Sequence, residues 1–213
     1  MAKVKKKVSK IKTKKKKWFP IFAPKFMGHK EIGETYLDNP EPAVGRILKV
    51  NLKELTGSFR DQNIYVSLRI KEVTGTNLQT EVVGYAYMPF FIKKLARRST
   101  GKIDDSFVLL TKEGKKIRLK PLIITINPVT KSVKTALRKR TIQLLAETIS
   151  ELPMEVLISE MLKYKIQMDL KNKLKKIYPV REVLMRVVKL EERKKVKVVE
   201  VKKETLEKKA VAE

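Results

Sequence analysis

The sequence predicts an α+β protein with an antiparallel, barrel-like β core, flanking helices and a basic N-terminal extension that is disordered when free. Two patterns of apolar residues along the chain predict this class. Apolar and polar residues alternate through much of residues 43–127, which is typical of strands. The apolar spacing then becomes helical from residue 128 onward. Hydrophobic residues make up 42% of the chain, which is enough to form a buried core.

Residues 1–38 are predicted to form the extension. Residues 1–30 contain 12 lysines and no acidic residue. The first 17 residues have too few apolar side chains to offset the entropy cost of ordering them. Residues 18–26 then bring four aromatic rings and two prolines, and the prolines favour extended backbone. These rings either anchor the extension to the protein core or stack on nucleic-acid bases, and the sequence leaves both interpretations open.

Residues 39–127 are predicted to form the β-rich core. Residues 38–42 contain two prolines and form a linker. The period-two pattern predicts a strand over residues 44–50, a hairpin with strands at 64–73 and 78–87, and a second hairpin with strands at 107–110 and 117–126. Residues 90–98 suit a short helix between the two hairpins.

Residues 128–192 are predicted to be helical, with a closing strand. Apolar spacing indicates a helix over residues 133–152, and Pro153 can begin a second one. A third helix carries Leu170, Leu174 and Ile177 on one side. Residues 180–190 alternate again and predict a strand that returns to the sheet. Residues 193–213 are predicted to be a charged tail.

The charge balance points to a polyanionic partner. The chain has 50 Lys and Arg against 23 Asp and Glu, a formal net charge of +27. Such an excess opposes compaction unless RNA, DNA or an anionic membrane neutralises it. The absence of cysteine excludes disulfides, zinc ribbons and cysteine nucleophiles. No apolar run approaches a membrane span and no secretion signal is present, so we expect a cytoplasmic protein.

Catalytic chemistry has little support in the sequence. His29 is the only histidine, so any His-based metal site or catalytic triad would depend on it alone. Residues 28–35 have the glycine spacing of a phosphate-binding loop, but Glu34 occupies the position of the cationic lysine. Asp104 and Asp105 fit a loop that leads into a strand. We therefore predict no catalytic residue, no metal and no cofactor.

Two basic clusters are the stronger signal. Lys93, Lys94, Arg97 and Arg98 are spaced to share one side of a helix. The second cluster lies at the start of the next predicted helix, where the helix dipole disfavours cations and favours a bound phosphate. In both clusters, a solvated surface is the alternative to RNA contact. The second cluster consists of Lys131, Lys134, Arg138, Lys139 and Arg140.

The predicted RNA-binding residues therefore lie in the extension and in these clusters. No base-reading module is visible, which favours recognition of a folded RNA by its shape and backbone. The predicted contacts are Lys5, Lys6, Lys7, Lys14, Lys15, Lys16, Lys17, Trp18, Lys25, His29, Lys30, Lys93, Lys94, Arg97, Arg98, Lys131, Lys134, Arg138, Lys139 and Arg140.

Several blocks in order resemble the small-subunit ribosomal protein family of archaea and eukaryotes called S3Ae, also classed as the eukaryotic-type small-subunit protein one. The similarity covers roughly residues 15–190. The blocks are Lys17-Trp18-Phe19, Ala23-Pro24-Lys25-Phe26, Ile32-Gly33-Glu34-Thr35, Gly45-Arg46 leading into Leu52-Lys53-Glu54-Leu55, Leu137-Arg138-Lys139-Arg140, and Ile177-Tyr178-Pro179-Val180-Arg181-Glu182-Val183.

This resemblance implies a structural constituent of the small ribosomal subunit, on its platform near the mRNA exit. It implies contact with ribosomal RNA (rRNA) and neighbouring small-subunit proteins, mRNA nearby, no membrane, no homo-oligomer and no catalysis. A free-standing RNA chaperone or assembly factor is the alternative. A peripheral membrane protein ranks last, because residues 1–17 lack the apolar face that an interfacial helix needs.

Overall fold

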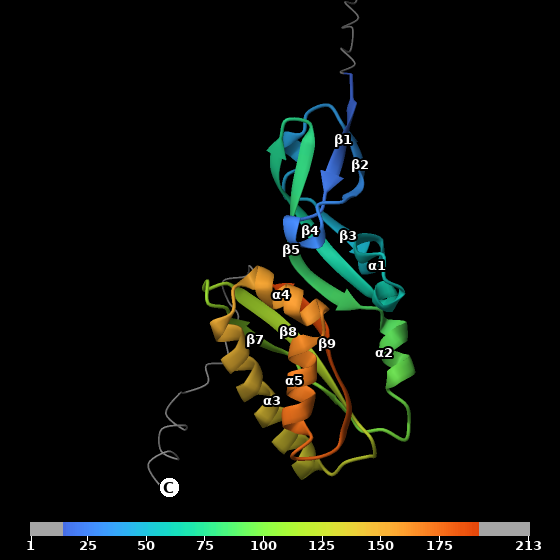
Figure 1. Ribbon diagram of the computed structural model, residues 1–213, viewed down its shortest axis with the longest axis vertical. Coiled ribbons are helices and arrows are strands. Elements are labelled where there is room, and N and C mark those ends of the chain that lie inside the picture. The colour runs from blue at the N-terminus through green and yellow to red at the C-terminus, as the bar shows by residue number, and fades with distance from the viewer. Residues whose placement is uncertain (1–14, 192–213) are drawn as a thin grey trace, which may run out of the picture.

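A computed structural model describes residues 15–191, so predictions for residues 1–14 and for the tail at 193–213 lie outside the described residues. Within this range the chain forms one nine-stranded sheet accompanied by helices (Figure 1). The strands are β1 (Lys17–Phe22), β2 (Glu31–Leu37), β3 (Ile47–Asn51), β4 (Ile64–Thr74), β5 (Asn77–Tyr87), β6 (Lys102–Asp104), β7 (Phe107–Leu110), β8 (Lys116–Thr125) and β9 (Val180–Leu190).

The helices fall into short connectors and one packed group. The packed group is α3 (Lys131–Glu151), α4 (Met154–Leu162) and α5 (Lys165–Leu174). The connectors are α1 (Leu52–Thr56), α2 (Pro89–Leu95) and three 3₁₀ turns at Lys25–Met27, Glu41–Ala43 and Phe59–Asn63. The α+β class, both predicted hairpins, the long helix and the closing strand are therefore confirmed.

The sheet is open, so the predicted barrel-like closure is wrong. The strand order is β2-β1-β5-β9-β8-β6, with β3 beyond β4, β4 on β5, and β7 on β8. Closure would require the outer strands to pair with each other. Among the described residues, neither β2 nor β3 pairs with β6 or β7. The pair formed by β1 and β5 is parallel, so the sheet is also not purely antiparallel.

Strand β5 joins the two halves of the sheet, which are β1–β4 on one side and β6–β9 on the other. It does so because β1 and β9 pair with the same edge of β5. Strand β4 pairs along the length of β5 on one side. On the other side, β1 pairs with Leu78 and Gln79, and β9 pairs with the segment from Gly84 to Ala86. A Cβ atom at Gly84 would lie 2.1 Å from the carbonyl oxygen of Val188. The close approach of β9 to β5 therefore requires glycine at position 84.

Residues 17–37, which were predicted to belong to the basic extension, form an ordered hairpin that is part of the sheet. Strands β1 and β2 are antiparallel, and β1 attaches them to the sheet through β5. Phe19 and Ile21 point inward and are about 5% and 4% exposed. They form a small second core with Ala43, Ile70 and Leu78. Burial of these two side chains thus offsets the entropy cost of ordering this proline-containing segment.

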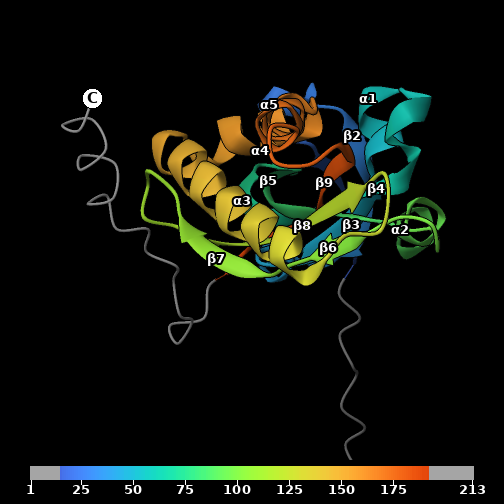
Figure 2. The same cartoon turned by 90° about the horizontal axis from the view of Figure 1, so that it is seen from below.

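The main core lies between the sheet and the packed helices. Figure 2 shows α3, α4 and α5 on one face of the sheet. Apolar side chains at helical spacing on α3, α4 and α5 share this core with inward side chains of β8 and β9. The buried set includes Leu137, Leu144, Leu145, Ile149, Leu157, Ile158, Leu122, Ile123 and Leu184. The opposite face of the sheet carries no helix of this group, which leaves its outward side chains accessible.

Glu182 on β9 should make folding stability depend on pH. Burial raises the pKa of its carboxyl above the ordinary 4.5, although Lys171 and Arg181 act in the opposite direction. A raised folded-state pKa favours folding below the unfolded pKa, and this contribution is lost as pH rises through the folded value. We expect Glu182→Gln to raise the melting temperature at pH 7, with the gain shrinking toward pH 4.

Circular dichroism melts of both proteins across this pH range would test the expectation. Glu147→Gln on the exposed side of α3 makes the same change of net charge and is the control. An equal shift in both variants, or a gain for Glu182→Gln that does not depend on pH, would contradict it.

Candidate nucleic-acid interface

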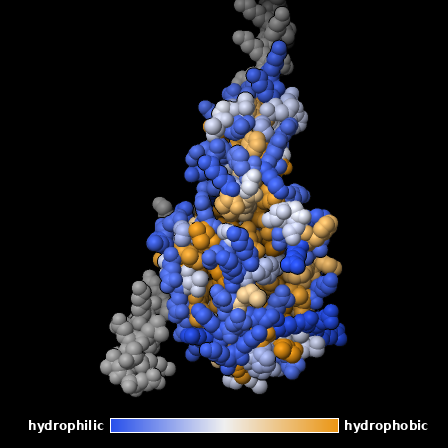
Figure 3. Space-filling model, in the orientation of Figure 1, coloured by the Kyte–Doolittle hydropathy of each residue, from blue (hydrophilic) through white to orange (hydrophobic). Residues whose placement is uncertain are grey.

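Two predicted basic clusters approach each other at the end of the molecule where α3 begins. The hydroxyl of Thr125, before α3, donates to the carbonyl oxygen of Gly101, in the loop after α2, at 3.2 Å. Nε of Arg138 lies 2.9 Å from a carboxylate oxygen of Asp105. These contacts connect the loop after α2 with the first turns of α3. This end is the lower one in Figure 1, and its surface is largely hydrophilic in Figure 3.

The start of α3 carries cations without local compensation. Its first turn contains no acidic residue, and Thr130 makes no side-chain capping hydrogen bond. Lys131 and Lys139 are exposed and Lys134 is half-buried. Within residues 15–191 these three lysines have no ion pair. Their ammonium groups therefore add to the positive end of the helix dipole and form an anion-binding surface.

The other two members of this cluster have protein partners. Arg138 pairs with Asp105, which the sequence placed in a loop with no part in chemistry. Nη1 of Arg140 lies 3.5 Å from the side-chain oxygen of Gln143. Both arginines remain exposed. Both can still bind a phosphate. Arg138 would then contact the phosphate and the carboxylate of Asp105 together, whereas Arg140 has no carboxylate partner among the described residues.

The cluster around α2 does not form the single helical face that its spacing predicts. Helix α2 ends at Leu95, and Ala96 leaves helical geometry at φ −84° and ψ 81°. Arg97 and Arg98 follow in a turn closed by a hydrogen bond from Thr100 N to the carbonyl oxygen of Arg97, at 3.2 Å. That part of the prediction is wrong. Lys93 and Lys94 are on the helix, and all four cations are exposed.

The N-terminal hairpin presents an exposed aromatic pair. Trp18 is 62% exposed, and its ring packs on Tyr36 with a centroid distance of 4.9 Å. Nζ of Lys16 lies 5.7 Å from the centroid of Tyr36. Lys15 and Lys17 are also exposed. Phe19 therefore anchors the strand to the core, whereas Trp18 faces outward, and base stacking by Trp18 stays a prediction.

Trp18→Ala is expected to weaken RNA binding roughly tenfold while changing the free energy of unfolding by less than about 1 kcal/mol. The lost ring is mostly solvent-exposed, so little burial is removed. Phe19→Ala, one residue along β1, should instead destabilise the fold by about 3 kcal/mol because that ring is buried. RNA affinity by filter binding and stability by urea denaturation separate the two effects. Equal loss of stability in both variants would show that Trp18 belongs to the core.

The residues around His29 are engaged in local structure. Nδ1 of His29 lies 3.2 Å from the carbonyl oxygen of Ala23, and its ring stacks on Phe22 with a centroid distance of 5.0 Å. Nζ of Lys30 donates to the carbonyl oxygen of Leu55 at 2.7 Å. Residues 31–37 form a strand instead of the helix that a phosphate-binding loop requires, which agrees with rejecting that motif.

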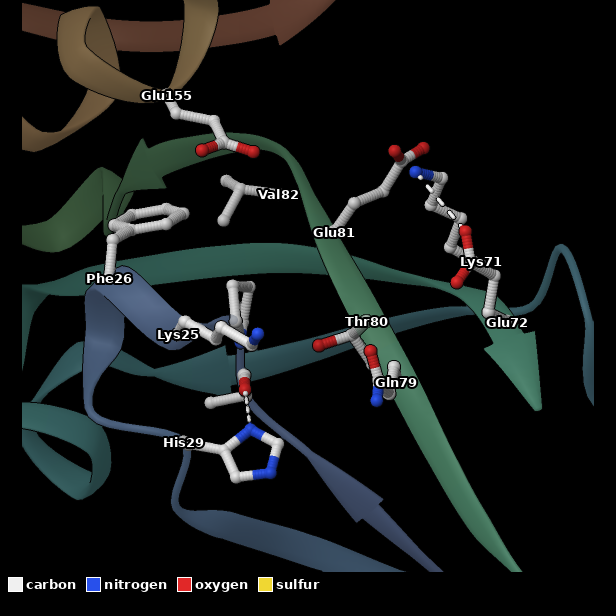
Figure 4. Close-up of a pocket in the computed structure, with 12 residues that line it drawn as sticks. Lys25, Phe26, His29, Lys71, Glu72, Gln79, Thr80, Glu81, Val82 and Glu155 are labelled. Carbon is white, nitrogen blue, oxygen red and sulfur yellow. Dashed lines mark hydrogen bonds and ion pairs between the residues drawn. The ribbon is translucent and has the colours of Figure 1, made fainter. Parts of the chain in front are cut away.

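Lys25 and His29 line a pocket of about 230 Å³ that has mixed charge (Figure 4). Its other charged residues include Glu81, Glu155 and the pair formed by Lys71 and Glu72, whose side chains lie 3.4 Å apart. Figure 4 shows His29 on the side of the pocket away from Glu155, with its ring directed toward the backbone. The carboxylates weaken this pocket as a phosphate site.

Neither a metal site nor a membrane-spanning helix is found in the described part of the chain. No group of three or more His, Cys, Asp or Glu side chains there could hold a metal ion. None of the helices over residues 15–191 is long and apolar enough to cross a bilayer.

A further basic surface was missed by sequence reasoning. Lys49, Lys102, Lys120 and Arg186 lie on four different strands and line one groove together with Lys93 of α2. They are far apart in the sequence, so no local cluster marks them. The available signal was that each occupies an outward position on a strand whose alternate residues are buried.

Comparison with known proteins identifies the family. Residues 3–194 match the model of the Ribosomal S3Ae family. The chain belongs to this family. The resemblance drawn from the sequence blocks is therefore confirmed.

Individual family members are similar over most of their length. The small ribosomal subunit protein eS1 of Archaeoglobus fulgidus is 33% identical over 177 residues, which cover 82% of this chain and 84% of that protein. The eS1 protein of Methanothermobacter thermautotrophicus is 31% identical over 183 residues, covering 86% and 94%. That of Methanobrevibacter smithii is 33% identical over 170 residues, covering 80% and 88%. The match to the family model, over residues 3–194, includes the helical part and the closing strand as well as the β-rich core.

Proposed function

We propose that the chain is a non-catalytic structural component of the small ribosomal subunit that binds rRNA on the platform, near the mRNA exit. It binds by neutralising phosphate charge and by fitting the shape of folded RNA. Its partners are rRNA and neighbouring small-subunit proteins, and its place is the cytoplasmic ribosome. Membership of the S3Ae family supports this assignment, since the relatives compared above are named as small-subunit proteins.

The observation that carries the mechanism is the uncompensated charge where α3 begins. Lys131, Lys134 and Lys139 have no ion pair within residues 15–191, although the helix dipole makes this the least favourable end for cations. A phosphate group at this end would interact with the lysines and with the free N–H groups of the first turn. The lysines of residues 5–7 and 14, outside the described residues, are proposed to add further phosphate contacts.

Phosphate neutralisation has a measurable consequence. Each contact releases counterions, so the affinity for RNA should fall steeply as salt rises. Because several surfaces contribute, the protein should nevertheless remain in an assembled subunit at moderate salt.

Sedimentation of cell extract through sucrose gradients at low and moderate salt tests the proposal. Co-migration with the small subunit in both conditions is the expected result. A protein that stays at the top of the gradient, or leaves the subunit at the mildest salt, would instead be a free RNA chaperone or an assembly factor.

A further inference from the structure

We infer that the groove between α2 and the helix-free face of the sheet is a binding site for an unpaired RNA strand. This inference rests on the proposed function and assigns a specific RNA form to one surface. The groove has a volume of about 590 Å³ and lies on the face of the sheet opposite α3 and α5. The residues that define it are Lys49, Tyr65, Lys93, Lys102, Lys120 and Arg186.

The floor of the groove is a row of paired strands with one exposed ring. Tyr65 on β4 pairs with Ala86 on β5, Ala86 pairs with Val187 on β9, and Val187 pairs with Lys120 on β8. Tyr65 is 38% exposed, and the small side chain of Ala86 beside it leaves the ring accessible from above. An aromatic ring on an uncovered sheet face is a platform on which an unpaired base stacks.

The charges of the groove favour an anion. Lys49, Lys93 and Lys120 have no ion pair among residues 15–191. The other two cations share a carboxylate oxygen of Asp104, which lies 3.4 Å from Nζ of Lys102 and 3.0 Å from Nη1 of Arg186. Asp104 therefore contacts two of the five cations that line the groove, and the other three have no ion pair among the described residues. The pocket beside His29 differs because three glutamates line it, and this contrast selects the groove as the phosphate site.

Arg186 gives the groove a second feature that suits a bound anion. It occupies a bulge in β9, between the pairs that Lys120 makes with Val187 and Pro121 makes with Met185. The bulge directs the side chain to the outward face. Its Nε is buried and has no acceptor in the described part of the chain. An unsatisfied buried donor is costly, and a phosphate drawn in beside this guanidinium would reduce that cost.

The dimensions favour a single strand over a duplex. Pockets of roughly 300–1,000 Å³ enclose small organic ligands, so this groove accommodates one or two nucleotides at a time. A-form RNA keeps its bases stacked inside the helix, where Tyr65 cannot reach their faces. An unpaired strand can place its phosphates along the lysines and one base on the ring.

Photo-cross-linking of the full chain to short oligouridine that carries 4-thiouridine tests the site directly. We expect a cross-linked peptide from β4 that contains Tyr65, and we expect an RNA duplex of the same length not to compete for it. Cross-links confined to other segments, or displacement by the duplex at equal concentration, would overturn the inference.

Fluorescence anisotropy with labelled oligouridine supplies a matched comparison of variants. The groove variant is expected to bind about tenfold or more weakly, with a smaller salt slope, while the control variant removes the same charge and should bind less than about threefold more weakly. An equal decrease in affinity for both variants would count against the groove. The groove variant combines Lys49→Gln, Lys93→Gln and Lys120→Gln, and the control combines Lys112→Gln, Lys163→Gln and Lys175→Gln.

The ribosomal role and the assignment of the groove can be rejected independently by these experiments. If the protein co-sediments with the small subunit but oligouridine cross-links elsewhere, the groove assignment fails alone. If oligouridine occupies the groove but the protein never enters a subunit, the ribosomal role fails and the site remains.

Discussion

Replacing Lys131, Lys134 and Lys139 with glutamate is expected to weaken binding to small-subunit rRNA by about 100-fold, taking a net cost of about 1 kcal/mol per phosphate. The slope of log affinity against log salt should also fall by about 0.9 for each phosphate that is no longer neutralised. Filter binding across a salt series measures both quantities. The same variant should accumulate at the top of a sucrose gradient.

The stability of this variant is informative because the helix dipole predicts the opposite sign. Two of the three glutamates, at positions 131 and 134, lie in the first turn of α3 and favour the helix. The melting temperature should therefore stay constant or rise while RNA binding weakens. The same reversal at Lys112, Lys163 and Lys175 makes the identical change in net charge elsewhere. If affinity falls as much in that control, the effect reflects total charge and α3 has no special role.

Gly84→Ala is expected to destabilise the fold by about 3 kcal/mol, which corresponds to a drop in melting temperature of about 10 °C. The added methyl group would lie 2.1 Å from the carbonyl oxygen of Val188 and 2.9 Å from Cα of Lys189. Both are backbone atoms of β9, so no side-chain rotation relieves the clash. Strands β5 and β9 must separate, and this opens the junction between the two halves of the sheet.

Gly33→Ala is the matched control for this effect. Gly33 lies in β2, and a Cβ atom there meets nothing within 4 Å. Its stability should change by less than about 0.5 kcal/mol. Thermal melts of both variants compare their melting temperatures. If Gly84→Ala is as stable as Gly33→Ala, then β5 and β9 do not approach each other as closely as described.

The elements that could be predicted are those whose periodicity is strong and uninterrupted. The β4–β5 hairpin alternates along both strands, and the turn at Gly75 separates them clearly. Strand β9 was predicted with its observed bounds. The β1–β2 hairpin could not be predicted in the same way, because Pro20 interrupts β1 and its partner β5 is distant in the sequence. Closure of the sheet depends on such distant pairing, which local pattern does not encode.

The interface shows the same division between local and distant information. The lysines at the start of α3 are neighbours in sequence, so their clustering was visible. The spacing of the cations predicts Arg97 on the helix, but α2 ends at Leu95 and Ser99 and Gly101 favour a turn there. The groove residues come from separate strands, and only the strand order brings them together. Their charge is evident in the composition, but their common location is not.

The arrangement of β5 between β1 and β9 also determines when a growing chain can finish its sheet. Strand β1 is made early, but its partner segment at Leu78 follows only after β4. The edge of β5 at Gly84 stays unpaired until Val187 and Lys189 of β9 have been synthesised. Until that moment β5 and β8 both present unpaired edges that can join another chain. A nascent chain halted after α5 should therefore aggregate, and rapid engagement of RNA or a chaperone would protect it.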